Sequence, residues 1–276
     1  MFNDPASAVP ATADTEETVL YSLSGGLATI TLNRPDKLNS LNAAMHERLR
    51  SLLTDISANH EVRALLIAAN GRGFCAGQDL NERRSASGQS NPDLGLTLEK
   101  NWNPLARALH YIRVPTVCAV NGVAAGAGVS IALGCDVVIA ARSASFVLSF
   151  SRLGLVPDAG ATYLLPRLVG EARAMGIALL GEKISAEEAA TLGLIWRQVD
   201  DDDLPAYARQ IAGRLAQGPT LGLSMIKRAL KASSTNSFED QLELERSSQR
   251  QCGFSDDYRE GVAAFIEKRQ PDYKGR

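Results

Sequence analysis

The chain has 276 residues, of which 45% are hydrophobic, so it can bury a core as one large domain or as one domain with an appendage. Its 29 basic and 31 acidic residues leave a net charge of −2, and the basic residues form no dense run, so nucleic acid is not an expected partner. The longest apolar stretch, residues 116–141, is broken by polar residues and glycines, which argues against a membrane span. With no export signal at the start, we expect a soluble, cytoplasmic protein.

The chain opens with a predicted flexible tail and then β structure. Residues 1–16 are rich in Ala, Thr, Asp and Pro, which is typical of a mobile terminus. Two β-rich runs, 18–23 and 27–32, flank Ser24-Gly25-Gly26 and predict a hairpin. Apolar residues at helical spacing then predict a helix from Asn42 onward: Met45, Leu49, Leu52, Leu53 and Ile56.

Strands and helices alternate through the middle of the chain. Residues 64–69 predict a buried strand, and the polar residues 81–96 predict a flexible loop that leads into a helix at about 97–111. Three further strands are expected at 116–120, 136–140 and 145–150. This alternation indicates an α/β sheet.

The last third of the chain is predicted to be helical. Strands nearly cease after Asp158, and we expect a core over residues 17–200 with a helical region over 201–276. Ser185 and Ser237 each begin a capping box. The expected helices are 159–168, 171–180, 186–192, 203–217, 219–232, 238–252 and 256–269.

The cysteines and histidines do not predict a metal site. The four cysteines form no C-x-x-C pair and lie in apolar or glycine-rich surroundings, which is typical of reduced thiols. The three histidines lack the spacing of metal ligands. We therefore expect no metal.

Two glycine-rich turns each follow a predicted strand. They are residues 71–80 (GRGFCAGQDL) and 121–128 (NGVAAGAG), and the second opens a helix. Unpaired N–H groups from two such turns can share one oxygen and form an oxyanion hole, which suits a carbonyl that becomes an enolate. Tight packing of strands against helices is the alternative interpretation. The second turn lacks the third glycine of a dinucleotide-binding motif, so such a site is set aside. A serine hydrolase with Ser130 as nucleophile is disfavoured, because that fold orders its triad serine, acid, histidine, and here every histidine precedes Ser130.

One carboxylate, Asp158, lies in an otherwise apolar stretch, residues 153–160 (LGLVPDAG). Its simplest role is as a turn or N-cap residue before the next helix. The alternative is catalytic, because an apolar, water-poor pocket disfavours the charged form of a carboxylate and makes it a stronger base toward a C–H bond.

These stretches, together with residues 33–40 (NRPDKLNS), resemble the enoyl-CoA hydratase/isomerase (crotonase) family. Four separated motifs occur in the family's order, and the resemblance runs from about residue 17 to the end. It implies an α/β crotonase (ClpP/crotonase-like) fold, with repeated ββα units in two near-perpendicular sheets. It also implies that the helical C-terminal region serves oligomerisation, as a homotrimer or a hexamer made of two trimers.

The resemblance also implies site residues for an acyl-CoA thioester substrate. The oxyanion amides fall on Gln78 and Ala127, and Lys268 is expected to approach the CoA phosphates across a subunit boundary. The remaining substrate-binding positions are Lys37, Ala76, Gly77, Asp79, Leu80, Gly126, Ser130 and Phe150. No cofactor is implied, because CoA is part of the substrate.

Two positions depart from the family's hydratases. Where those enzymes carry two glutamates that hold the added water, this chain has Ser130 and Phe150, so hydration of the usual kind is disfavoured. Asp158 matches the single acid/base residue of several isomerases in the family. The motifs are most similar to the family's isomerases of bacterial phenylacetate breakdown, which implies an acyl-CoA isomerase. A hydratase and a non-catalytic acyl-CoA-binding subunit remain the alternatives.

Overall fold

The computed structural model describes residues 17–79 and 93–276. The predicted tail at 1–16 and residues 80–92, which include Leu80 and most of the predicted loop, lie outside the described residues. Within the described ranges, none of the helices combines the length and the apolar character needed to cross a bilayer.

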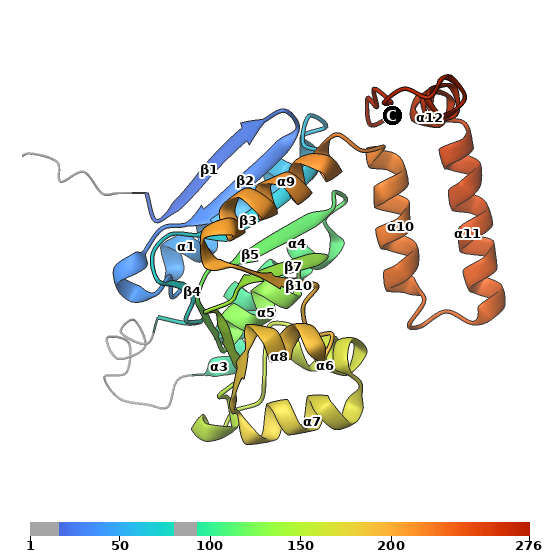
Figure 1. Cartoon of the computed structure of the whole chain (residues 1–276). Helices are drawn as coiled ribbons and strands as arrows, with labels where there is room; N and C mark the ends of the chain where they lie inside the picture. The colour runs from blue at the N-terminus through green and yellow to red at the C-terminus, as the bar shows by residue number, and fades with distance from the viewer. Residues whose placement is uncertain (1–16, 80–92) are drawn as a thin grey trace, which may run out of the picture.

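A six-stranded sheet forms the centre of the molecule (Figure 1). The predicted hairpin is confirmed, because β1 (Val19–Ser24) pairs antiparallel with β2 (Leu27–Leu32). The other neighbours in the sheet pair in parallel, in the order β1-β2-β3-β5-β7-β10. Every residue of β5 is buried, as expected for a central parallel strand. The remaining strands are β3 (Ala64–Ala69), β5 (Thr116–Val120), β7 (Val137–Ala141) and β10 (Arg197–Val199).

A second, four-stranded sheet has the order β4-β6-β8-β9. β4 (Gly73–Cys75), β6 (Val123–Ala125) and β8 (Ser145–Val147) each follow a strand of the large sheet and precede helical segments. The predicted ββα units are therefore present. β9 (Lys183–Ser185) and β10 were not predicted, and the residues of β4 and β6 were predicted only as parts of the two glycine-rich turns. Three residues are too few to show a strand period.

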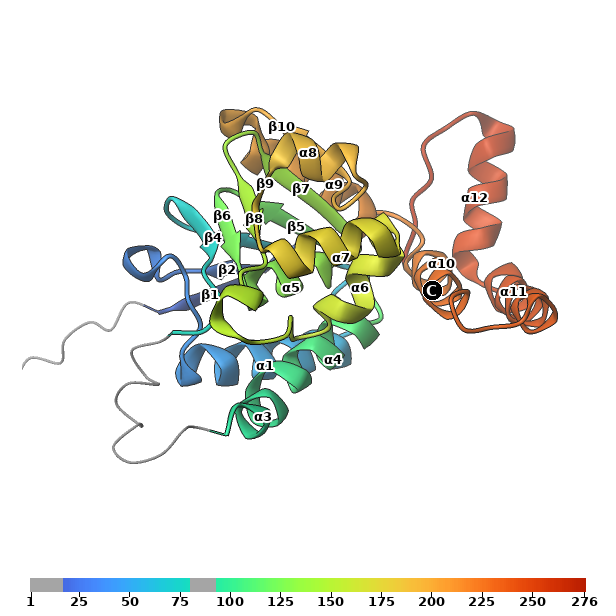
Figure 2. The same ribbon diagram turned by 90° about the horizontal axis from the view of Figure 1, so that it is seen from below.

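Helices cover both faces of the large sheet (Figure 2). α1 (Ala43–Ala58) begins at Asn42, whose side chain accepts the Met45 N–H at 3.0 Å, and its predicted apolar face is buried. α1 and α4 (Asn103–Tyr111) lie on one side, and α9 (Leu204–Ala216) packs on the other. α5 (Ala127–Leu133) packs between β4, β6, α4 and α6, so all of its residues are buried.

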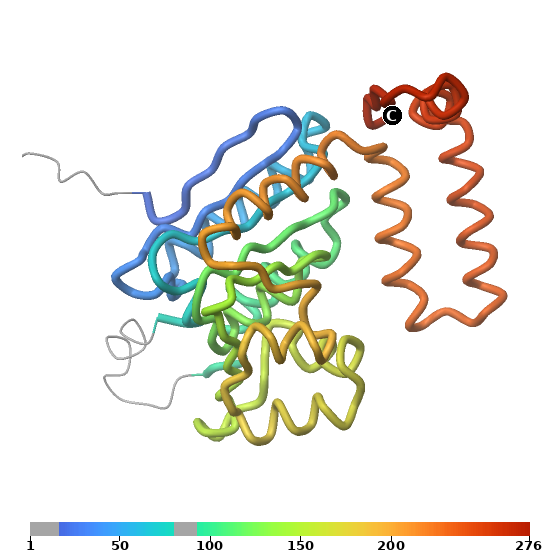
Figure 3. The backbone as a smooth tube through the Cα atoms, viewed as in Figure 1, coloured from blue at the N-terminus to red at the C-terminus, as the bar shows by residue number. Residues whose placement is uncertain are grey.

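The helices after residue 160 agree closely with the predicted ranges, and the capping serines are confirmed. By contrast, the short helix α3 begins inside the predicted loop at 81–96. Ser185 accepts from Glu188 N–H and Ser237 from Asp240 N–H, each at 3.1 Å. After α9 the chain leaves the core and continues as a three-helix arm, α10 to α12 (Figure 3). The bounds are α3 (Leu94–Thr97), α6 (Ala161–Val169), α7 (Glu171–Leu180), α8 (Ala186–Thr191), α10 (Thr220–Ala232), α11 (Phe238–Gly253) and α12 (Asp256–Glu267).

The cysteines are free thiols, as predicted. Three of them, Cys75, Cys118 and Cys135, are buried in the core. Burial raises the pKa of Cys75 to about 12, so its unreactive protonated form persists at neutral pH.

Candidate active site

The turn after β4 lies directly against the turn that opens α5. Gly77 has a φ of +84°, and a Cβ at this position would lie 3.0 Å from the Ala125 oxygen and 3.4 Å from the Ala127 nitrogen. A side chain would therefore be strained by the backbone and would press between the two turns. Glycine here lets the two predicted amide-bearing segments touch.

The packing interpretation of the glycine turns is confirmed at one position. Gly128 serves packing, because a Cβ there would lie 2.2 Å from the Cys75 oxygen. The amides of Gln78 and Ala127 serve neither packing nor secondary structure: within residues 17–79 and 93–276, neither donates a hydrogen bond. Ala127 is the first residue of α5, where an N–H has no partner within the helix. Two available donors therefore lie on neighbouring turns.

The Gln78 side chain is fixed at both ends. Its Nε2 donates to the Leu41 carbonyl at 3.2 Å, and its Oε1 accepts from the Trp102 indole N–H at 2.9 Å. The sequence pattern favours only a core or interface role for Trp102. Trp102 and Gln78 are 24 residues apart, so their hydrogen bond produces no pattern in the local sequence.

Residues 33–40 (NRPDKLNS) form hydrogen bonds and an ion pair with the first glycine-rich turn and the residues around it. Asn39 is fully buried, and its Nδ2 donates to the carbonyls of Asn70 and Gly73 at 2.9 and 2.8 Å. Arg34 forms an ion pair with Asp79 at 3.0 Å, which places Asp79 beside the turn. The Ala76 N–H donates to the Leu38 carbonyl at 2.9 Å. Lys37, by contrast, is exposed in the short helical turn Pro35–Lys37.

Asp158 lies in a turn that is tied to α5. The Ser130 hydroxyl donates to the Asp158 carbonyl at 2.9 Å. Ala159 has a φ of +50° and Gly160 a φ of +90°, so a non-glycine residue beside Asp158 occupies the left-handed region that is common at functional sites. The Oδ1 atom of Asp158 is shielded from solvent.

The capping interpretation of Asp158 is wrong. The N-cap residue of α6 is Gly160, and no side chain caps this helix. The Asp158 carbonyl accepts the Ala161 N–H at 3.0 Å, so Asp158 is the first residue of the turn that leads into α6.

Ser130 and Phe150 both lie beside the turn that opens α5. Ser130 is 2% exposed, and its hydroxyl donates to the main chain of Asp158. The tip of the Phe150 ring lies 3.7 Å from the Cβ position of Gly126, just before the Ala127 amide. An apolar ring at this point offers no polar atom that could hold a water molecule.

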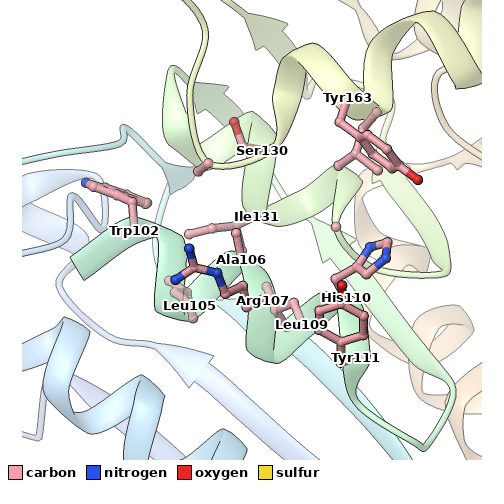
Figure 4. A pocket seen from close by; sticks show the side chains of 14 residues that line it. Trp102, Leu105, Ala106, Arg107, Leu109, His110, Tyr111, Ser130, Ile131 and Tyr163 are labelled. Carbon is pink, nitrogen blue, oxygen red and sulfur yellow. The ribbon is translucent and has the colours of Figure 1, made fainter. Parts of the chain in front are cut away.

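A cavity of about 300 Å³ lies beside these groups (Figure 4). The wall of the cavity does not include Gln78, Ala127 or Asp158, but it includes a neighbour of each. Trp102 is hydrogen-bonded to Gln78, and Ala159 follows Asp158 in the chain. Ser130 lies on the same helix as Ala127 and is hydrogen-bonded to Asp158. No Asp or Glu lines the cavity; the wall consists of Trp102, Leu105, Ala106, Arg107, Leu109, His110, Tyr111, Ser130, Ile131, Gly134, Ala159, Gly160, Tyr163 and Leu164.

The cavity is suited to an apolar, ring-sized group. Its wall is mostly aliphatic and aromatic, as is common for small-molecule sites. Burial, together with Lys231 and Lys227, lowers the pKa of His110, which keeps this imidazole neutral at physiological pH. Arg107, a charged residue of the cavity wall, is paired with Glu99 at 3.3 Å.

Lys268 is not near the two turns within one chain. It is the exposed residue that ends α12, with a φ of +54°, and α12 belongs to the arm that leaves the core (Figures 1 and 3). Leu80, the last predicted residue of the first turn, lies outside the described residues. Among the described residues, no three His, Cys, Asp or Glu side chains form a group that could hold a metal ion.

The family model for enoyl-CoA hydratase/isomerase matches residues 22–276. The chain belongs to this family. It is 52% identical to the 1,2-epoxyphenylacetyl-CoA isomerase of Escherichia coli, covering 94% of this chain and 99% of the relative. It is 48% identical to a probable enoyl-CoA hydratase of Rhodobacter capsulatus, covering 94% and 98%.

Solved structures confirm the fold. The crystal structure of an enoyl-CoA hydratase from Bacillus anthracis superimposes with a TM-score of 0.89 at 32% identity, covering 94% of this chain and 100% of that one. The crotonase fold expected from the sequence is therefore correct, and the chain is a member of an enzyme family that includes a named isomerase.

Proposed function

We propose that this chain is an acyl-CoA isomerase that works through a thioester enolate. The proposed substrate is 2-(1,2-epoxy-1,2-dihydrophenyl)acetyl-CoA and the product is oxepin-CoA. The same groups would also shift the double bond of an enoyl-CoA. The substrate assignment is supported by the 52% identity to the E. coli isomerase and by the apolar, ring-sized cavity.

The observation that carries the proposal is the bond between Asp158 and α5. Ser130, which donates to the Asp158 carbonyl at 2.9 Å, lies one helical turn after Ala127. The turn that carries Asp158 is therefore hydrogen-bonded to the same helix, α5, that supplies the Ala127 amide. The Gln78 turn lies against that unit and supplies the second donor.

The proposed chemistry needs one base and two donors. The Asp158 carboxylate removes a proton from the carbon beside the thioester, and the electron pair moves onto the thioester oxygen, which accepts from the Gln78 and Ala127 amides. The carboxylic acid then returns the proton to another carbon of the conjugated system. In an enoyl-CoA, one C–H bond breaks and another forms. In the epoxide, the C–C bond shared by the epoxide and the six-membered ring also breaks, and its electrons enter the double bonds of the seven-membered oxepin ring. The composition of the substrate does not change in either case.

Exchange of substrate protons with deuterium tests the role of Asp158. Phenylacetyl-CoA cannot isomerise, yet it can form the enolate, so its exchange in D₂O reports the proton transfer alone. We expect Asp158→Asn to bind phenylacetyl-CoA as the parent does and to exchange at least about 10²-fold more slowly. The control is Asp202→Asn, an exposed carboxylate outside the site. Exchange by Asp158→Asn within a few-fold of the parent would exclude Asp158 as the base.

Hydration is the second candidate function, supported by the 48% identical relative. It requires a group that holds water near the substrate, and Ser130 and Phe150 are poorly suited to this. Loss of the conjugated thioester absorbance of crotonyl-CoA measures hydration directly. Rapid loss would favour the hydratase over the isomerase.

We also propose a homotrimer or a hexamer of two trimers. Large apolar side chains are exposed on α7 and at the end of α12, including Leu179 at 68% and Phe265 at 85%. Such surface is typical of an interface between subunits. The measured mass in solution should be three or six times that of one chain, and a monomer at micromolar concentration would contradict the proposal.

A further inference from the structure

The cavity beside the candidate site has two ends (Figure 4). Trp102, the last residue of the π-helical turn Leu98–Trp102, lies at one end and is hydrogen-bonded to Gln78. His110 and Tyr163 lie at the other end. The helical run from Trp102 to His110 spans about 12 Å, at about 1.5 Å per residue. An acyl group whose thioester lies at the two glycine-rich turns therefore points toward His110 and Tyr163.

His110 and Tyr163 lie between this cavity and a second one. The second cavity has a volume of about 550 Å³, and residues of α4, α6 and α10 line it, including both His110 and Tyr163. The two rings meet edge-on, with centroids 6.0 Å apart and an interplanar angle of 85°. Because one ring belongs to α4 and the other to α6, their contact spans the gap between these helices. Tyr111 borders both cavities as well, but it is 79% exposed and therefore lies at their rim.

Neighbouring charged groups hold the two residues where their rings meet. The Arg167 guanidinium lies 3.6 Å from the centre of the Tyr163 ring, which is a cation–π contact. The main chain at the end of α4 is tied to α10, because the His110 carbonyl accepts the Lys231 Nζ at 2.8 Å. The contact between the rings is therefore part of the packing of three helices.

The second cavity differs from the first in charge. Four basic side chains line it, and none of the described Asp or Glu residues does; the basic residues are Arg113, Lys227, Arg228 and Lys231. Asp136 pairs with both lysines, so the group keeps a net positive charge. We call this second cavity the basic pocket. An apolar chain that entered it would take water away from these cations, which is unfavourable.

We infer that the His110 and Tyr163 rings form a partition that ends the acyl cavity, so that these two residues determine the longest acyl group that the enzyme accepts. Opening the partition would join the cavity to the basic pocket, which suits a longer acyl group that ends in a carboxylate. The inference rests on the proposed function. One methylene group more than a pocket can hold typically costs about tenfold or more in kcat/KM.

Two probes with the same acidic C–H bond test the partition. One is phenylacetyl-CoA, and the other carries a hexanoate chain at the para position, which is long enough to reach the two rings. The readout is the ratio of kcat/KM for the long probe to kcat/KM for the short probe, measured by exchange in D₂O. We expect a ratio below about 0.1 for the parent, and His110→Ala and Tyr163→Ala should each raise it about tenfold or more.

Two controls keep the partition closed. Tyr163→Phe retains the ring and should retain the parent's ratio. Tyr21→Ala removes a tyrosine of similar exposure, 36% against 40% for Tyr163, from β1, outside both cavity walls, and should also leave the ratio unchanged.

An uncharged para-heptyl chain tests the charge beyond the partition. In His110→Ala and Tyr163→Ala, we expect this chain to gain less than the hexanoate chain does, because only the carboxylate pairs with the basic side chains. Equal gains for the two chains would overturn the role of the basic pocket.

Two outcomes would overturn the partition itself: a ratio near one for the parent, or ratios within twofold of the parent's in both alanine variants. If one alanine variant folds poorly, the other, on a different helix, decides. Isothermal titration gives the affinities of the same probes without turnover, and these should follow the same order. A parent protein that binds phenylacetyl-CoA but exchanges no protons would refute the proposed function, whereas the affinities would still test the partition.

Discussion

At the scale of single residues, the sequence points to candidate catalytic groups but not to the contacts that support them. Asp158 and the amides of Gln78 and Ala127 are predicted from motifs, and the structure brings their segments together through Ser130 and Gly77. The Ser130 hydroxyl bond and the Trp102 indole bond join segments 28 and 24 residues apart. Periodicity and motif spacing carry no information about such pairs.

His46 gives a prediction about pH. Burial, and then the charge of Arg50, lower its pKa from 6.5 to about 4, while the nearby Gln78 side chain opposes the shift. The folded state therefore prefers the neutral ring, and this stability is present above the unfolded value of 6.5 and is lost as pH falls toward 4. The full effect is about 3 kcal/mol.

Urea unfolding between pH 7.5 and 4.5 measures this effect. The free energy of unfolding of the parent should fall with pH more steeply than that of His46→Leu, which cannot be protonated at this position. His60→Gln, at an exposed site, should keep the parent's slope. Equal slopes in the parent and His46→Leu would show that His46 does not carry the effect.

At the scale of elements, length decides what can be predicted. The long helices α7 and α9 to α12 show several turns of periodicity and were placed to within a few residues. The three-residue strands β9 and β10 show none, and the π-helical turn before α4 depends on packing against α1. Short elements are fixed by their tertiary neighbours, which a local pattern does not contain.

The contact between α10 and the core gives a prediction about stability. Asp136 accepts from the Thr116 N–H at 2.8 Å and pairs with Lys227 at 2.7 Å and Lys231 at 3.6 Å. Because the Lys227 side chain is only 9% exposed, Asp136→Asn leaves a buried ammonium without its counter-charge. The free energy of unfolding should fall by about 3 kcal/mol.

An exposed ion pair serves as the control for the buried pair of Asp136 and Lys227. Arg142 and Asp200 also form an ion pair, but their side chains are 70% and 62% exposed. Asp200→Asn should therefore cost less than about 1 kcal/mol in urea unfolding. Equal losses for Asp136→Asn and Asp200→Asn would contradict the argument from burial.

At the scale of the whole molecule, the fold could be predicted and the assembly remains a proposal. The α/β alternation and the helical end follow from the order of elements, whereas the ββα repeat follows from the family resemblance. The match over residues 22–276 confirms the family. The arm formed by α10 to α12 projects from the core (Figure 3). Contacts between chains leave no trace in the periodicity of one chain.

Lys268 gives a prediction at this scale. It is exposed on the arm and distant from its own site in the ribbon (Figure 1), so it reaches CoA phosphates only in a neighbouring subunit of the proposed trimer. Lys268→Ala should raise KM for phenylacetyl-CoA several-fold at low salt, with kcat unchanged and the difference reduced by added salt. Lys274→Ala, which removes another exposed lysine of the C-terminal segment, is the control. Equal KM in both variants and the parent would exclude the contact.

The most direct test of the central claim is a crystal structure with phenylacetyl-CoA bound. We expect the thioester oxygen to lie about 2.7–3.1 Å from both the Gln78 and the Ala127 nitrogens, with the Asp158 carboxylate facing the carbon beside the thioester. An oxygen bound elsewhere, or a carboxylate turned into bulk solvent, would contradict it.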